Sequence, residues 1–584
     1  MKYKLFIHDR EYTNWSYINE ETFQQDIENP FPQVNPITYK WFNKDIILYD
    51  PQQQEQQQQK QQPFITTVYS YIRNAQEIAG ILVLENNKTY GREHTKKSNK
   101  KLLYKCIPDD KHLPVFLIPY EPQIHFTKVF KNKYVLFKFD NWDETHPQGK
   151  LTSTIGDVDN HEHFYEYQLY CKSLHISLTY FTNKTREQLQ HNTIEQILSN
   201  PNFHIEDRRT HLRPITIDPQ KSTDFDDAFS IFHNNDKTHI TIYIANVFIW
   251  LETLNLWKSF TNRVSTIYLP DKKRPMLPTI LSDQLCSLQE GQDRFTFALD
   301  LVYDRSTNTL IQSSFKTALV NVSHNYRYES PQLQQDTQYN LLYDFTRALD
   351  KNITDSHDVI AYWMVKMNSI AGEEMAKHKT GIYRQATLTR SINEIPLSDN
   401  LSQSAKRTIT MWNNVSGQYV LYSENIHHDI MKLSNYTHVT SPIRRIVDLL
   451  NQMLIYMSHT LVTTLSDDAQ EFLDKWLHQL PYINTSMRSI RKIQTDCEIL
   501  YRCISNPSLL ESQHTGILFD KIQKNDGGFV YMIYLETLNL LTRLKTYTEY
   551  ENYSTQPLQL FLFMDEHSLK KKIRVQICES QSQR

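Results

Sequence analysis

Four aspartates crowd into ten residues of this chain, at Asp218, Asp224, Asp226 and Asp227. Carboxylates this close together repel one another, and a folded protein tolerates them when something offsets their charge. Hard cations such as Mg2+ prefer carboxylate oxygens, and enzymes use metals held in this way to cleave phosphodiesters. The cluster therefore indicates a metal site that acts on phosphate.

A solvated acidic loop is the alternative that the spacing alone leaves open. The flanking residues argue against it, because residues 214–217 and 228–232 are apolar and rich in strand formers. An EF-hand loop is excluded. Counted from Asp224, the sixth residue is Phe229 where glycine is needed, and the twelfth is Asn235 where glutamate is needed.

Two further blocks follow the cluster in the chain. Residues 268–288 contain Y-L-P, P-M-L-P and L-C-S-L, and residues 436–450 read Y-T-H-V-T-S-P-I-R-R-I-V-D-L-L. Together with T-I-D-P and D-F-D-D-A at residues 216–228, they resemble the ribonuclease II/R (RNB) exoribonucleases. The resemblance covers roughly residues 205–505 and is closest in style to the eukaryotic exosome-nuclease-type members.

The resemblance implies a site for one or two Mg2+ ions, with Mn2+ as a substitute, held by the four aspartates. It makes Asp224, Asp226 and Arg444 the catalytic residues, with Asp226 the most sensitive to substitution. Arg444 would offset charge on the phosphate, and an ordinary surface salt bridge is its alternative role.

The same resemblance implies a second group of residues that contact RNA. Tyr268 would stack on bases, although a buried structural tyrosine is also possible at this position. Arg263 would contact phosphate, and His438 could equally be a structural histidine. The expected RNA-binding residues are Tyr268, Arg263, Arg444, Arg445 and His438.

Local signals predict two helices near these blocks. Apolar residues recur at helical spacing over residues 355–377 and again over residues 441–457. Ser441 followed by Pro442 is a favourable helix start, which would place Arg444 in the first turn beside free N–H groups.

Three positions depart from the family pattern. The family sequence I-A-D-V has Asn246 in place of the aspartate, the usual His-Arg pair after D-L-L is replaced around residues 451–453, and a common histidine is replaced by Ala386. Because all four clustered aspartates remain, we expect the metal site to survive, with a change in local hydrogen bonding around Asn246.

Composition limits the possible partners and surroundings. The net charge is −3 and the pI about 6.8, so RNA binding would depend on a local basic surface. Six dispersed cysteines without a C-x-x-C pair suggest reduced thiols, and the polar N-terminus is no signal peptide. No run of 18 apolar residues occurs. We expect an intracellular, cytoplasmic protein without a membrane segment.

The expected fold class is α+β and multidomain. Short strand-like runs and the resemblance predict cold-shock/OB barrels at residues 1–110 and 111–200, with a disordered glutamine-rich loop at residues 51–63. An RNB α/β catalytic domain is expected at residues 201–505, and a divergent S1-type OB barrel at residues 506–584. A basic run at residues 96–101 is either a solvated loop or an RNA backbone contact.

The function implied by the resemblance is processive 3′-to-5′ hydrolysis of single-stranded RNA with release of nucleoside 5′-monophosphates. An RNA-binding protein that kept the scaffold and lost catalysis is the rival, and it is disfavoured because the aspartates and Arg444 remain. A DNA nuclease is a weaker alternative. We expect a monomer without stable exosome association, because no stretch resembles the endonuclease domain of the exosome subunit.

Overall fold

The computed structural model describes most of the chain in two units. The described residues are 1–20, 31, 34–49, 65–93, 101–122, 130–190, 193–210, 212–385, 401–415, 417–423, 427–428, 433–524 and 526–578. The first unit comprises residues 1–175, 495–514 and 557–584, and the second comprises residues 176–494 and 515–556. The predicted disordered loop, most of the basic run and Ala386 lie outside the described residues.

The first unit begins with a four-stranded antiparallel sheet in the order β2-β1-β3-β4. Its strands are β1 (Lys2–Ile7), β2 (Trp15–Asn19), β3 (Ile46–Tyr49) and β4 (Ile65–Tyr69), followed by the short helix α2 (Tyr71–Asn74). Alternate residues of β1 are buried, so one face of this sheet packs onto a core rich in aromatic side chains.

A closed barrel follows in the first unit, in the order β5-β6-β7-β9-β8. It consists of β5 (Ile78–Leu82), β6 (Leu102–Pro108), β7 (Phe116–Tyr120), β8 (Lys133–Asn141) and β9 (Gln148–Asp157), with η1 (Glu85–Asn87) after β5 and α3 (His161–Cys171) after β9. The predicted domain boundary at residue 110 is wrong, because it falls between β6 and β7, two strands that pair within this barrel.

The second unit is built on a seven-stranded sheet in the order β10-β17-β16-β13-β12-β11-β18. Its strands are β10 (Ile205–Asp207), β11 (Ile215–Asp218), β12 (Asp227–Asn234), β13 (Lys237–Ala245), β16 (Asp293–Asp304), β17 (Leu310–Asn321) and β18 (His324–Arg327). The pairs β10–β17 and β11–β18 are parallel and the others are antiparallel.

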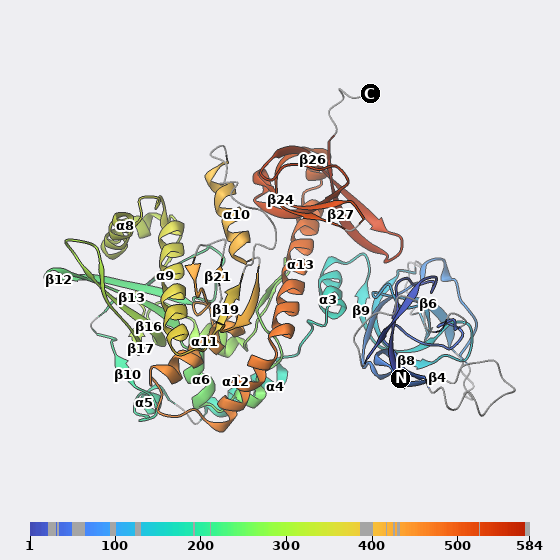
Figure 1. Ribbon diagram of the computed structural model, residues 1–584, viewed down its shortest axis with the longest axis horizontal. Coiled ribbons are helices and arrows are strands. Elements are labelled where there is room, and N and C mark those ends of the chain that lie inside the picture. The colour runs from blue at the N-terminus through green and yellow to red at the C-terminus, as the bar shows by residue number, and fades with distance from the viewer. Residues whose placement is uncertain are drawn as a thin grey trace. The chain divides into compact units, whose positions relative to one another are not determined.

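Helices accompany this sheet (Figure 1). They are α4 (Thr179–Leu189), α5 (Ile194–Leu198), α6 (Val247–Thr253), α7 (Pro331–Gln335), α8 (Thr337–Leu349), α9 (Ser356–Lys377), α10 (Gln403–Val415), α11 (Ile446–Ser458) and α12 (Asp467–His478). The prediction of a helix over residues 355–377 is confirmed by α9. A Cβ added to Gly372 of α9 would lie 1.7 Å from the Asn435 carbonyl oxygen, so only glycine allows the helix to approach that backbone so closely.

Short elements connect the sheet and helices of the second unit. They are η2 (Trp257–Ser259), β14 (Ile267–Tyr268), β15 (Lys273–Arg274), η3 (Ile280–Cys286), β19 (Ile382–Gln385), β20 (Gln418–Leu421), β21 (His427–His428) and β22 (Leu433–Ser434). The η3 segment is a π-helix. The β14–β15 hairpin pairs Tyr268 with Lys273, which places both side chains beside the acidic cluster described below.

The last elements are divided between the units. Helix α13 (Leu480–Ser505) runs from the second unit into the first and is followed by α14 (Ser508–Glu511). Five strands follow, in the part of the chain where the S1-type barrel was expected. They are β23 (Gln513–Gln523), β24 (Phe529–Leu535), β25 (Leu540–Thr546), β26 (Thr555–Asp565) and β27 (Lys570–Ile577), with η4 (Glu536–Leu538) after β24. Strands β23, β24 and β25 form an antiparallel meander, and β26 pairs with β27. Among the described helices, none combines the length and apolarity required to cross a bilayer.

Candidate functional site

Asp226 joins two blocks that are far apart in the sequence. It precedes β12, its carbonyl oxygen accepts a hydrogen bond from Ala245 N (2.8 Å), and its side chain is buried. Its Oδ1 accepts a hydrogen bond from Ile443 N at 3.1 Å, and its Oδ2 pairs with Arg444 Nε at 3.1 Å. The acidic cluster and the segment 436–450 therefore form one site.

Residues from the block 268–288 also belong to this site, because they contact Asp224. Tyr268 donates its hydroxyl to Asp224 Oδ2 at 3.2 Å, and Lys273 Nζ lies 3.3 Å from Asp224 Oδ1. Lys273 also donates to Thr223 Oγ1 (2.7 Å) and pairs with Asp283 (3.1 Å). The Tyr268 side chain is 40% exposed, so one end is fixed by the carboxylate while part of the ring faces solvent.

Arg444 lies in a turn that precedes helix α11. The predicted helix start at Ser441 is wrong, since α11 begins at Ile446. The N–H groups of Arg444 and Arg445 donate to the Ser441 carbonyl, and Ile446 N donates to Val264 O. The turn is thus held by a neighbouring segment instead of continuing as helix. Its Ser441 hydroxyl accepts from Arg444 Nη2 at 3.1 Å, and so orients the guanidinium.

Three carboxyl groups of the cluster have raised pKa values. Burial raises the pKa of Asp218 to about 7, and the nearby Asp226 also raises it, against the opposing effect of Arg327 and Arg444. Burial likewise raises the pKa of Asp226 to about 7, with Arg444 lowering it. The pKa of Asp227 rises to about 8 because of burial and the proximity of Asp218. Ionised carboxylates at these positions are therefore costly without a compensating charge.

The aspartates do not form a ready-made metal cage. Within the described part of the chain, no group of three or more His, Cys, Asp or Glu side chains is arranged to hold a metal ion. Asp226 is bound to Arg444, and Asp224 is bound to Tyr268 and Lys273. In kind, however, the donors fit a hard divalent cation, because they are oxygen ligands that are buried and mutually repulsive.

Three predicted RNA-binding residues have structural roles. Arg263 is buried and donates from Nη1 to Pro275 O (2.9 Å) and from Nη2 to Ile176 O (2.6 Å). His438 is buried, with Nδ1 2.8 Å from the Tyr419 hydroxyl. Arg445 forms a bidentate pair with the fully buried Asp448, at 2.8 and 2.7 Å. A direct RNA contact by Arg263 is contradicted by its burial and its carbonyl partners.

The sequence motifs did not indicate two positively charged residues of the site, Lys273 and Arg327. Lys273 could have been found, because it faces Tyr268 across the short hairpin between Y-L-P and P-M-L-P. Arg327 had no local signal. Its position opposite Asp218 depends on the parallel pairing of β11 with β18, and its guanidinium donates to Pro219 O (3.0 Å) and Ser222 O (3.3 Å). It thereby supports the loop that carries the aspartates.

Asn246, which departs from the family pattern, has a structural role. Its side chain is fully buried and accepts a hydrogen bond from Ile249 N at 3.1 Å, which caps helix α6. Its Nδ2 donates to the Tyr456 hydroxyl at 2.5 Å, and Thr317 Oγ1 donates to the same oxygen at 3.0 Å. The amide thus links the sheet, α6 and α11.

Removal of this amide should destabilise the fold. We expect Asn246→Ala to lower the free energy of unfolding by about 1–3 kcal/mol, because it leaves the N-terminus of α6 uncapped and removes one of the two hydrogen-bond partners of the buried Tyr456 hydroxyl. Asn246→Asp should be closer to wild type, since aspartate caps equally well and can accept from Tyr456. Urea unfolding of both variants tests this, and equal losses for the two would contradict the capping role.

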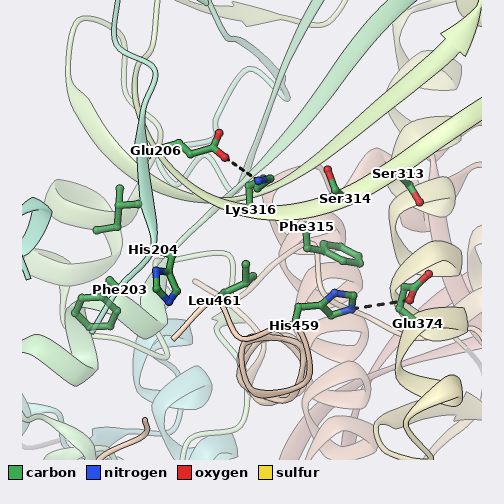
Figure 2. Close-up of a pocket in the computed structure, with 11 residues that line it drawn as sticks. Phe203, His204, Glu206, Ser313, Ser314, Phe315, Lys316, Glu374, His459 and Leu461 are labelled. Atoms are coloured by element: carbon green, nitrogen blue, oxygen red, sulfur yellow. Dashed lines mark ion pairs between the residues drawn. The ribbon is translucent and has the colours of Figure 1, made fainter. Parts of the chain in front are cut away.

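A cavity of about 670 Å3 lies at the other edge of the sheet. Its lining residues are Phe203, His204, Ile205, Glu206, Ser313, Ser314, Phe315, Lys316, Glu374, His459 and Leu461. Figure 2 shows two ion pairs here, Lys316–Glu206 at 2.9 Å and His459–Glu374 at 3.9 Å. Four strands separate β10 from β11, so about 24 Å of sheet lies between this cavity and Asp218. None of the predicted site residues lines it.

The fold is that of a multidomain α+β protein with an OB-type β-barrel. Its candidate site is a group of carboxylates with positively charged partners. Residues 208–338 and 330–460 match the RNB domain family, and residues 103–166 match the Dis3-like cold-shock domain 2. The chain therefore carries an RNB domain, as the sequence blocks predicted. The cold-shock match lies largely within the closed barrel of the first unit.

Curated relatives match parts of the chain. Ribonuclease R of Mycoplasmopsis pulmonis is 34% identical over 143 residues, which are 24% of this chain and 19% of the relative. Ribonuclease R of Chlamydia pneumoniae is 25% identical over 315 residues, 41% of this chain and 46% of the relative. The exosome complex exonuclease RRP44 of Mus musculus is 25% identical over 236 residues, which are 39% of this chain and 24% of the relative. Each match spans less than half of the relative's length.

Solved structures share the fold. Mycoplasma genitalium RNase R in complex with ribose-methylated single-stranded RNA aligns with a TM-score of 0.66 at 14% identity, and the alignment covers 99% of this chain and 100% of the other. Yeast Ssd1, a pseudonuclease, aligns with a TM-score of 0.54 at 13% identity. This alignment covers 93% of this chain and 78% of Ssd1. The same architecture thus occurs in a nuclease and in a pseudonuclease.

Proposed function

We propose that this protein is a divalent-metal-dependent exoribonuclease that degrades single-stranded RNA processively from the 3′ end and releases nucleoside 5′-monophosphates. The observation that supports this most strongly is the pair between Asp226 and Arg444, which sets a half-exposed guanidinium against a buried group of carboxylates. The RNB domain and the likeness to Ribonuclease R support the same reaction.

The four aspartates are the groups that would hold Mg2+, with Mn2+ as a substitute. A bound divalent ion would supply an activated water and stabilise the leaving 3′ oxygen. The protein contributes the placement of its ligands, because Asp218 ends β11, Asp227 begins β12, and Arg327 supports the loop between them. Lys273 and Tyr268 hold the Asp224 carboxylate in place at one side of the site.

Arg444 is suited to bind the reacting phosphate. Its bonds to Asp226 and Ser441 use two of the five N–H donors of a guanidinium. Its side chain is 46% exposed, so donors remain for a phosphate oxygen. Since the pair with Asp226 orients the group beforehand, it can stabilise charge that develops on the phosphate. Tyr268 offers its exposed ring for stacking of a base near the cleaved bond.

Loss of Arg444 should impair the reaction strongly. We expect Arg444→Ala to lower the hydrolysis rate about a hundredfold, a typical effect for removal of a charge-stabilising donor. Arg444→Lys should recover little, because an ammonium group cannot bind Asp226 and a phosphate as a planar fork does. Single-turnover rates measure this, with Arg347→Ala on the exposed surface of α8 as the control. A rate for Arg444→Ala within threefold of wild type would remove this arginine from the mechanism.

Circular RNA tests whether cleavage requires a free end. With Mg2+ present, we expect the protein to degrade a linear single strand to nucleoside 5′-monophosphates and to leave a circle of the same sequence intact. Separation of the products by chromatography identifies them. Cleavage of the circle at a comparable rate would show an endonuclease and would overturn the proposal.

An inactive RNA-binding protein on the same scaffold is the second candidate. Two observations favour it: the aspartates do not converge into a metal cage within the described residues, and the fold is also that of a pseudonuclease. The two candidates differ in one result, because the inactive protein would bind linear RNA and never shorten it in Mg2+ or Mn2+.

We further propose that the protein acts as an intracellular, cytoplasmic monomer on single-stranded RNA, without stable association with an exosome. The dispersed spacing of its cysteines, without a C-x-x-C pair, supports the intracellular setting. All six, at Cys106, Cys171, Cys286, Cys497, Cys503 and Cys578, are free thiols in the structure. Size-exclusion chromatography with light scattering would test the monomeric state.

A further inference from the structure

Lys570, the first residue of β27, has a buried side chain. It is 6% exposed, and lysine is seldom buried unless its charge is paired. Its Nζ pairs with Asp109, which directly follows β6, and lies 4.8 Å from the centre of the fully buried Tyr167 ring in α3. The ammonium group is therefore held in one position, where the last hairpin of the chain meets the barrel of the first unit.

A thiol belongs to the same cluster. Lys570 Nζ lies 3.6 Å from Sγ of Cys171, the last residue of α3. Cys171 is partly exposed, whereas four of the other five cysteines are buried, so a small oxidant in solution can reach its sulfur. We call Lys570, Cys171, Asp109 and Tyr167 the lysine–thiol cluster.

The neighbours of the thiol can accept its proton and stabilise an oxygen on its sulfur. Burial raises the pKa of Cys171 to about 12, although Lys570 opposes the rise, so the resting group is a thiol. Burial favours a higher pKa for Asp109, but Lys570 outweighs it and holds this pKa below its usual value. Asp109 can thus act as a base while the sulfur attacks an oxidant. The buried Tyr167 hydroxyl has no hydrogen-bond partner among the described residues and can donate to the new oxygen.

We propose that Cys171 and Lys570 form a reversible covalent cross-link when a peroxide oxidises the protein. In the first step, Sγ attacks one oxygen of the peroxide and the O–O bond breaks. The sulfur loses two electrons to the peroxide and becomes a sulfenic acid. The thiol proton passes through Asp109 to the departing oxygen, which with hydrogen peroxide leaves as water.

In the second step, Nζ of Lys570 attacks the sulfur and the S–O bond breaks. One proton of the ammonium leaves with the hydroxyl group as water, and a second passes to Asp109, so that a neutral S–N bond remains. Sulfenic acids condense with nearby nitrogens in this way, and the step needs no further oxidant. Two molecules of an added thiol reduce the S–N bond and restore the free thiol and amine, with formation of a disulfide between them.

This modification site goes beyond the proposed hydrolysis and is independent of it. The lysine–thiol cluster lies in the first unit, whereas the aspartates and Arg444 lie in the second. The cross-link joins residues that are 399 positions apart in the sequence, and so fixes the last hairpin to α3. Because a covalent ring reduces the conformational freedom of the unfolded chain, the oxidised protein should resist unfolding better than the reduced protein.

The experiment treats the full-length protein with a small excess of hydrogen peroxide, with and without dimedone, a reagent that traps sulfenic acids. The protein is then digested without reductant and analysed by mass spectrometry. A cross-linked pair of peptides weighs less than the two separate peptides by one molecule of hydrogen. The variants are Cys171→Ser and Lys570→Arg, which keeps the positive charge but has no nucleophilic amine. Lys571→Arg is the matched control, since this residue is the next lysine of β27.

We expect wild type and Lys571→Arg to give the pair joined at Cys171 and Lys570, and dithiothreitol to reverse it. Lys570→Arg should give no pair and several times more dimedone adduct at Cys171, because its sulfenic acid has no amine with which to condense. Cys171→Ser should give neither product. Thermal unfolding of wild type should shift to a higher temperature after oxidation, and that of Lys570→Arg should not.

Absence of the pair from oxidised wild type would overturn the inference, whether Cys171 stays unmodified or stops at the sulfenic acid. This measurement decides the matter even if a variant fails to fold, because it needs only the natural sequence. A pair formed through Lys172 or Lys571 in place of Lys570 would also overturn the inference. Equal dimedone trapping in wild type and Lys570→Arg would do the same.

Discussion

Replacing Asp226 with asparagine should lower the rate of RNA hydrolysis at least a hundredfold. Asp226 joins the acidic cluster to the turn that contains Arg444, because its carboxylate contacts Ile443 N and Arg444 Nε. Asparagine can still accept the bond from Ile443 N, but it has no charge to orient Arg444 or to bind a metal. Losses of this size are typical when a group that stabilises transition-state charge is removed.

The fold and the affinity for RNA should be affected much less. Thermal unfolding of Asp226→Asn should lie close to wild type, and its RNA affinity in EDTA should stay within threefold. Asp207→Asn serves as the control, because this aspartate lies in β10 at the other edge of the sheet, where it pairs with Arg209. A hydrolysis rate for Asp226→Asn near that of Asp207→Asn would show that the cluster is not catalytic.

The metal-free protein should lose stability as the pH rises, and Asp227→Asn should reduce that loss. The folded-state pKa of Asp227 is about 8, and those of Asp218 and Asp226 are about 7, all raised by burial. Unfolded aspartates lose their protons near pH 4, so between about pH 4 and pH 8 the folded state holds more protons than the unfolded state. The contribution of these groups is complete below about pH 4 and is lost as the pH passes 7 to 8.

Asp227→Asn removes one of these ionisations and the repulsion that it causes with Asp218. In EDTA at about pH 9, we expect this variant to exceed wild type in free energy of unfolding by a few kcal/mol, at about 1.4 kcal/mol per unit of pKa shift. Mg2+ should reverse the order, since wild type keeps the full set of ligands and gains binding energy.

Urea unfolding at about pH 6 and about pH 9, with EDTA or Mg2+, tests both the loss of stability with rising pH and the effect of Mg2+ on wild type and Asp227→Asn. The expected pattern is a pH-dependent loss for wild type in EDTA that Mg2+ restores, and a smaller loss for Asp227→Asn. Stability in EDTA that is flat across this range would contradict the buried, repelling carboxylates. An equal gain from Mg2+ in both proteins would contradict the role of Asp227 as a ligand.

The central features of the site could be predicted from local sequence. Asp218, Asp224, Asp226 and Asp227 lie within ten residues, and the structure brings Arg444 to Asp226 as the family blocks imply. These features could be found because each motif is a short contiguous stretch that specifies its own chemistry.

Features that depend on tertiary contacts could not be predicted in this way. Arg327 reaches the site through pairing of strands about a hundred residues apart. Ser441 followed by Pro442 is a typical helix start, yet Val264 takes the Ile446 amide and the helix begins later. Arg263 matches a family position, but its neighbours bury it against backbone carbonyls. In each case a distant segment overrode the local signal.

The domain boundary near residue 110 failed for a related reason. Strand alternation indicates that strands are present, but it does not show which strands close a barrel. Closure here depends on pairing of β5 with both β6 and β8, and β8 begins at Lys133, about fifty residues after the end of β5 at Leu82.

The most direct test of the account is degradation of single-stranded RNA labelled at its 5′ end, with wild type and Asp226→Asn, in Mg2+ and in EDTA. We predict that wild type in Mg2+ produces a ladder that ends in a short 5′ fragment, and that EDTA and the substitution each abolish it. Intact RNA after incubation with folded, RNA-binding wild type in Mg2+ or Mn2+ would contradict the proposed exoribonuclease, and the chain would then be an RNA-binding member of its family.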